Sequence, residues 1–156
     1  MSWSELRFGK HKGKSLPQVL FSDPDWFFWA YEKKVFHDRL KTEADRIHAR
    51  ATHIRIPDKG DENRVAEYAV HPNQGKFAGM ELVPASRPPH KGSTPTFRSK
   101  VIDMSIPRRL APYDKLGCRL LVRSIKFHVF GDEKARMTKE RCEVFFDDTS
   151  RFALTD

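Results

Sequence analysis

The first residues with a clear chemical use lie in a short turn that holds three lysines. Lys10, Lys12 and Lys14 alternate with turn-forming residues around Gly9 and Gly13. Glycine lets a backbone approach a phosphate group closely, and the helix that should follow offers free N–H groups at its start. The two glycines are one residue too close together for the phosphate-binding loop of nucleotide hydrolases. We therefore expect this turn to contact the phosphates of a nucleic acid.

A second basic segment covers residues 84–115 and begins with a Pro-rich basic loop at 84–100. Cations in this segment that we predict to bind phosphate are Arg87, Lys91, Arg98, Lys100, Arg108 and Arg109. Proteins that bind single-stranded nucleic acid place cations against the phosphates and stack aromatic rings on the bases. We predict that three rings could stack on bases, namely Trp3, Phe97 and Tyr113. The alternative interpretation is a basic arm with no binding role.

These two segments account for the net charge of +8. Residues 1–14 carry four basic residues against one glutamate, and residues 84–115 carry seven against two aspartates, while the remainder is balanced. Localised positive charge favours a polyanionic partner. No apolar run approaches the roughly 20 residues of a membrane helix, and two cysteines cannot form a disulfide scaffold. We expect a cytoplasmic protein with no membrane association.

Carboxylates offer a weaker catalytic pattern. Asp25 and Glu32, followed by two lysines, imitate the arrangement by which nucleases hold a divalent metal. Both carboxylates fall on one predicted helix, however, and Asp25 suits the positive end of a helix dipole. Three residues that could bind zinc lack the close spacing of structural sites: Cys118, His128 and Cys142. We expect no catalytic residue, no metal and no organic cofactor.

One motif carries a family resemblance. Residues 8–16 read F-G-K-H-K-G-K-S-L, and the segment D-P-D-W-F-F-W follows from residue 23. Over residues 5–36 the chain resembles the small C-terminal module of exodeoxyribonuclease X-like proteins and a related family described as quorum-sensing-regulated virulence factors, often found in phage genes. The resemblance implies a compact strand–turn–helix unit attached to nucleic-acid-processing domains. The exonuclease catalytic domain of such enzymes is not recognisable here.

The first third of the chain should be mainly helical. A strand is expected at 5–8, and capping residues with prolines at the first helical positions predict helices at 16–22 and 24–34. The second of these is so rich in aromatic residues that we expect it at the centre of a core. Apolar spacing predicts a third helix at 38–51.

Residues beyond the third helix should be rich in strands. We predict strands at 53–57, 64–70, 76–83, 101–106, 117–130 and 142–146, with a bulge at Gly79. A change in apolar parity within 117–130 suggests a second bulge. The expected fold class is α+β, with an aromatic-rich strand–turn–helix module at 1–51 and a β-rich domain at 52–156 that forms a curled sheet or a small barrel.

The leading hypothesis is a non-enzymatic nucleic-acid-binding protein, associated with phage or mobile elements, whose partner is DNA or RNA. A second hypothesis is a protein–protein adaptor or inhibitor of a host nucleic-acid-processing machine, which would bind a host or phage protein through the aromatic module. A third is a metal-dependent nuclease that uses Asp25 and Glu32.

Overall fold

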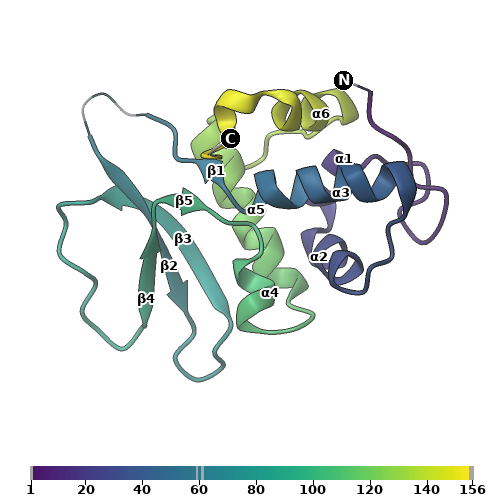
Figure 1. The fold of residues 1–156 in the computed structure, drawn as a ribbon. Coiled ribbons are helices and arrows are strands. Elements are labelled where there is room, and N and C mark those ends of the chain that lie inside the picture. Colours follow the sequence, from purple (N-terminus) through teal and green to yellow (C-terminus); the bar gives the residue numbers. More distant parts are fainter. Residues whose placement is uncertain (1, 59, 61, 155–156) are drawn as a thin grey trace.

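A computed structural model describes residues 2–58, 60 and 62–154, and it has the expected α+β fold. In chain order its elements are α1 (Leu16–Ser22), α2 (Pro24–Glu32), α3 (Asp38–Ala51), β1 (Ile54–Arg55), β2 (Arg64–Val70), β3 (Phe77–Pro84), β4 (Thr96–Ser99), β5 (Val101–Ile102), α4 (Ile106–Leu110), α5 (Lys115–Phe130), α6 (Lys139–Asp147) and the 3-10 turn η1 (Thr149–Arg151). Figure 1 shows the sheet at one side and α1–α3 at the other, with α5 between them. The long helix α5 therefore borders both halves of the molecule.

The three N-terminal helices follow the predicted boundaries closely. Ser15 and Gln18 form a capping box at α1, and the Asp23 carboxylate caps α2 by accepting the N–H of Trp26. Prolines near the first position of both helices fit there because that position needs no N–H donor. The strand predicted at 5–8 is wrong, since Glu5 forms only an isolated bridge with Ser15.

The largest correction concerns residues 117–130, which belong to helix α5 instead of the predicted strand. Asp114 starts this helix by accepting the N–H of Gly117 at 2.9 Å, and Gly131 ends it with a left-handed φ of 79°. Its buried residues recur at helical spacing: Cys118, Leu121, Val122 and Ile125. The parity change that we interpreted as a bulge is this helical period.

The strand predicted at 142–146 is wrong for the same reason. Thr138 caps α6 by accepting the N–H of Arg141, and the helix buries Cys142, Phe145 and Phe146 on one face. β-branched and aromatic residues favour strands, but here their burial on one helical stripe determines the structure.

Two small sheets are present where we predict one curled sheet or a small barrel. One contains three antiparallel strands in the order β3-β2-β4, and the other pairs β1 with β5. The described strands form no closed barrel, because β3 and β4 both lie at edges. The predicted strand at 101–106 covers only residues 101–102, while the predicted irregularity at Gly79 is present as a register shift against Ala69 and Val70.

One hydrophobic core joins the N-terminal and C-terminal parts of the chain. Phe27 of α2 and Phe146 of α6 are both fully buried in it, as is Tyr68 of β2. The aromatic helix α2 thus lies in the core, as predicted, with Trp26 and Trp29 partly buried at its margin. Within the described residues, no helix has the length and hydropathy needed to cross a bilayer.

Candidate nucleic-acid interface

A cleft of about 600 Å³ lies between the lysine turn, the start of α2 and one face of α5. Six lysines and arginines line it, and Asp23 is the one carboxylate among the lining residues. The six cations are Lys10, Lys14, Lys115, Arg119, Arg123 and Lys126. We refer to this feature as the cationic cleft. An excess of cations around a concave surface raises the local concentration of anions.

The turn holds two of its lysines toward this cleft and directs the third elsewhere. Gly9 and Gly13 adopt positive φ values of 72° and 89°, which glycine tolerates without strain. Backbone hydrogen bonds of 2.8 Å from Leu6 N–H to the Lys14 carbonyl and from Gly13 N–H to the Leu6 carbonyl fix the turn. Lys10 and Lys14 line the cationic cleft, whereas Lys12 lines a separate cleft of about 900 Å³. The three lysines therefore do not act on one surface.

Four of the six cations lie on α5, and none of them is among the predicted site residues, although Lys115 is the last residue of the predicted basic segment 84–115. Lys115, Arg119, Arg123 and Lys126 are spaced by four, four and three residues, which places them along one side of a helix. This stripe is next to the buried face that contains Cys118 and Val122. On the strand that we predict there, Arg119 and Arg123 would share one face and Lys126 would lie on the other, so the sequence does not indicate one continuous stripe.

Asp23 sits at the centre of the charges at one end of the cleft. Its carboxylate lies 2.7 Å from Lys115 Nζ, 3.0 Å from Lys10 Nζ and 3.0 Å from His11 Nε2. Burial raises the pKa of Asp23, but the hydrogen bonds from Lys115, Lys10 and His11 outweigh it and hold the pKa well below the ordinary value. Asp23 is therefore ionised at neutral pH and neutralises part of the positive charge.

His11 forms the buried wall of the same end. Its ring packs edge-on against Trp26 at 5.0 Å, and Nδ1 has no hydrogen-bond partner among the described residues. Burial lowers the pKa of His11, and the neighbouring Asp23 offsets this only in part. The ring is therefore mostly neutral at pH 7, so it adds little charge to the cleft.

The cations predicted in the 84–115 segment do not form one patch. Arg108 is the most enclosed: its side chain is 12% exposed and contacts Asp25 at 3.3 Å and Glu32 at 2.8 Å. Arg109, which is 62% exposed, pairs with Asp103 at 3.0 Å. These pairs attach α4 to α2 and to the β5–α4 connection. Arg108 is thus engaged in holding the fold.

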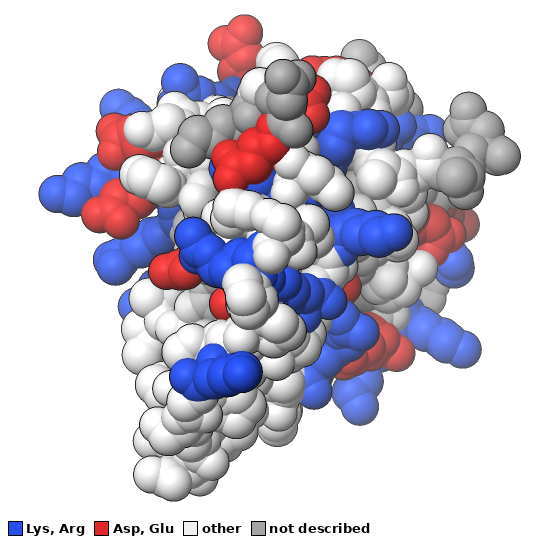
Figure 2. Space-filling model, turned by 90° about the vertical axis from the view of Figure 1, so that its left-hand side faces the viewer, with Lys and Arg blue, Asp and Glu red and all other residues white. Residues whose placement is uncertain are grey.

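The remaining cations of that segment lie on or near the sheet. Arg98 pairs with Glu67 at 2.7 Å and donates to the carbonyls of Arg87 and Pro88, so it anchors the Pro-rich loop. Lys91 and Lys100 are exposed. On the face that carries the sheet, Figure 2 shows lysines and arginines across the middle and a lower projection that is almost uncharged. Arg87 and Arg123 both line another cleft, which lies between β3 and α5. Positive charge therefore continues from α5 toward the start of the Pro-rich loop.

The three candidate stacking rings have different surroundings. Trp3 is buried, at 6% exposure, and its indole N–H donates to Asp147 at 3.0 Å, so it presents no face to a base. Phe97 is 38% exposed and stacks on Tyr68 with a centroid separation of 5.1 Å. Tyr113 is 72% exposed and lies two residues before Lys115. Tyr113 therefore has the most exposed ring of the three candidates.

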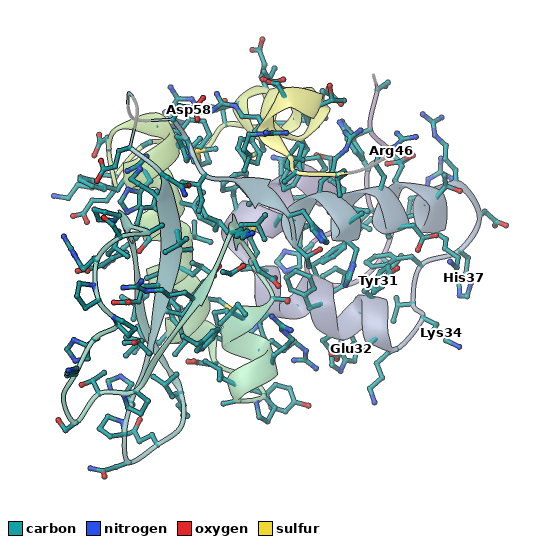
Figure 3. The ribbon with its side chains drawn as sticks, turned by 60° about the vertical axis from the view of Figure 1, so that its left-hand side comes forward. Tyr31, Glu32, Lys34, His37, Arg46 and Asp58 are labelled. Carbon is teal, nitrogen blue, oxygen red and sulfur yellow. The ribbon has the colours of Figure 1, made fainter. Side chains whose placement is uncertain are left out.

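The carboxylates of the nuclease hypothesis are also engaged. Asp25 is buried and contacts both Arg108 and Lys115, while Glu32 receives two hydrogen bonds from Arg108. Figure 3 shows Glu32 near the end of α2, with Lys34 and His37 on the connection beyond it. The described residues contain no group of three or more His, Cys, Asp or Glu side chains that could hold a metal ion. Among the residues that we considered for zinc, burial raises the pKa of the Cys118 thiol to about 12, so this thiol is protonated at neutral pH.

No protein-family model, curated protein or solved structure matches this chain. The resemblance of residues 5–36 to the exonuclease-associated module, and the association with phage that it implies, therefore stay predictions.

Proposed function

We propose that the protein binds nucleic acid through its phosphate backbone, at the cationic cleft, without cleaving it. The observation that carries the proposal is the cleft itself, which is lined by six cations from two separate segments and by one carboxylate. Like charges at helical spacing repel one another, and a bound anion relieves that repulsion. A chain of phosphates supplies that charge along the whole of the stripe.

The dimensions of the stripe fit a strand of nucleic acid. Residues 115 and 126 are 11 positions apart, which corresponds to about 16 Å along a helix. One strand of a duplex carries a phosphate about every 3.4 Å along its axis, so the stripe spans roughly five phosphates. Lys10 and Lys14 add charge from the lysine turn, which also lines the cleft. The exposed ring of Tyr113 is available for stacking where the stripe begins.

Contacts to phosphate give a definite salt dependence. Four cations of the cleft form no ion pair among the described residues: Lys14, Arg119, Arg123 and Lys126. Four phosphate contacts give a slope of log K against log salt of about −3 for a single strand and about −4 for a duplex. A measured slope of this size would indicate that the cations of the cleft make all of the phosphate contacts.

The experiment titrates the purified protein into labelled single- and double-stranded oligonucleotides at several salt concentrations, with and without Mg²⁺. Binding that follows these slopes, with the oligonucleotide intact, supports the proposal. Absence of binding near physiological salt would contradict it, and Mg²⁺-dependent cleavage that is lost in Asp25→Ala would favour the nuclease hypothesis. Replacing Lys10 and Lys14 together with alanine should weaken binding, whereas Lys12→Ala, which removes a charge from the other cleft, should have a smaller effect.

A further inference from the structure

A second cleft, of about 510 Å³, runs between strand β3 and helix α5. Four consecutive residues of β3, residues 80–83, line it. Because successive side chains of a strand point to opposite faces of its sheet, four in a row can border one cleft only where it follows the edge of the strand. The strand order β3-β2-β4 does place β3 at an edge.

The hydrogen bonds show which backbone groups of β3 face this cleft. Val70 N–H donates to the Pro95 carbonyl beside β4. The N–H and C=O groups of the even-numbered residues of β2 therefore point to β4, and those of the odd-numbered residues point to β3. The register pairs Val65 with Val83 and Glu67 with Glu81, so the backbone N–H and C=O groups of Val83 and Glu81 point toward β2. The N–H and C=O groups of Met80 and Leu82 must then point outward. In the described part of the chain, no hydrogen bond reaches them.

The opposite wall of the cleft comes from α5 and supplies both apolar and positive groups. Phe127, which is 57% exposed, lines this wall together with Leu120 and Arg123. Arg87 lies at the cleft from the loop after β3. Neither arginine forms an ion pair among the described residues, although Glu81 and Glu133 also border the cleft. An open strand edge beside a helix is the geometry by which some domains bind extended peptides.

We propose that the β3 edge binds an extended segment of a partner protein, which adds to the sheet as a further strand. The outward backbone groups of Met80 and Leu82 would pair with its main chain, since an exposed edge is a template for another strand. Residues 80–83 offer about 13 Å of edge, the length of four strand residues. Phe127 and Leu120 select apolar side chains that point toward α5, and Arg87 and Arg123 select an acidic residue. This inference does not depend on the proposed function.

The test begins with a displayed library of random peptides of about eight residues, twice the length of the open edge. Panning against the whole protein should enrich sequences that alternate apolar residues and contain Asp or Glu. A synthetic peptide from this set should bind at least about tenfold more weakly to Phe127→Asp, because the substitution places a charge in the apolar wall. Leu116→Asp is the matched control: Leu116 is 65% exposed on the same helix but does not line the cleft, so binding should be unchanged.

N-methylation of the peptide tests the strand pairing directly. Methyl groups on one set of alternate amides should abolish binding, while methyl groups on the intervening amides should leave it intact, because only one set faces β3. Equal effects of both sets, or equal binding to Phe127→Asp and to the unsubstituted protein, would overturn the proposal, as would a library that yields no binder. A dimer that Phe127→Asp dissociates in sedimentation would overturn it in favour of a second copy of this chain. Phe127→Ala, which removes the ring and adds no charge beside Arg123, should also weaken the peptide but leave oligonucleotide binding unchanged, so the two sites can fail independently.

Discussion

Replacing Asp23 with asparagine should strengthen nucleic-acid binding. The Asp23 carboxylate holds Lys10 and Lys115 at 3.0 and 2.7 Å and so competes with phosphate for both. Asparagine removes the charge and keeps an oxygen that can cap α2 at the N–H of Trp26. The substitution thus changes the electrostatics of the cleft with the smallest change in structure.

The expected size follows from the charges. Release of Lys10 raises the number of phosphate contacts from four to five, because Lys115 keeps its contact with the buried Asp25. The single-strand salt slope then steepens from about −3 to about −3.5. A phosphate about 8 Å from Asp23 is repelled by about 0.5 kcal/mol in water and by about 2 kcal/mol at an effective dielectric constant of 20. Loss of this repulsion corresponds to a gain in affinity of about 2- to 30-fold.

Fluorescence anisotropy with a labelled single strand, measured at several salt concentrations, gives both quantities. The matched control is Asp148→Asn, since Asp148 also accepts a backbone N–H at the start of a helical turn and pairs with an arginine, but lies outside the cleft. A folded Asp23→Asn protein, judged by its melting curve, that binds no more tightly and with an unchanged slope would refute the reasoning.

Three further predictions concern residues that the sequence suggested for other roles. Arg108→Ala should lower the free energy of unfolding by about 2–3 kcal/mol because it leaves the buried Asp25 with Lys115 as its remaining cation, whereas Arg109→Ala, at an exposed pair, should cost about 1 kcal/mol or less; equal changes in denaturant midpoint would contradict this. Arg98→Ala should free the Pro-rich loop, which faster amide exchange over residues 85–95 would show and unchanged exchange would exclude. Since burial raises the pKa of both thiols to about 12, Cys118 and Cys142 should resist iodoacetamide at pH 8 in the native protein and react once it is unfolded; rapid native labelling would disprove this.

The helices near the N-terminus could be predicted because their signals are local. Asp23 followed by Pro24 marks the start of α2 whatever the rest of the chain does. Helix α5 was missed because its leucine, valine, isoleucine and phenylalanine residues also suit a buried strand, and the period that distinguishes the two is hard to recognise in so apolar a segment. Because the helix was not predicted, the basic stripe along it was not recognised either.

Several features of the site depend on contacts between residues that are far apart in sequence, so local sequence patterns could not predict them. Arg108 and Asp25 are 83 positions apart in sequence, so nothing local shows that Arg108 is neutralised. The burial of Trp3 likewise depends on packing against the C-terminal helix, where its indole meets Asp147. The division of the lysine turn between two clefts depends on neighbours that only the folded chain brings together.

The central claim is that the basic side of α5 is the surface that binds nucleic acid. Its most direct test compares the salt dependence of oligonucleotide binding in Arg119→Ala/Arg123→Ala with that in Lys33→Ala/Lys34→Ala, which removes the same charge at the end of α2, outside the cationic cleft. We predict that the α5 variant loses affinity and that its single-strand slope falls from about −3 to about −1.5, while the α2 variant keeps its slope. Equal slopes and affinities in the two variants would contradict the account.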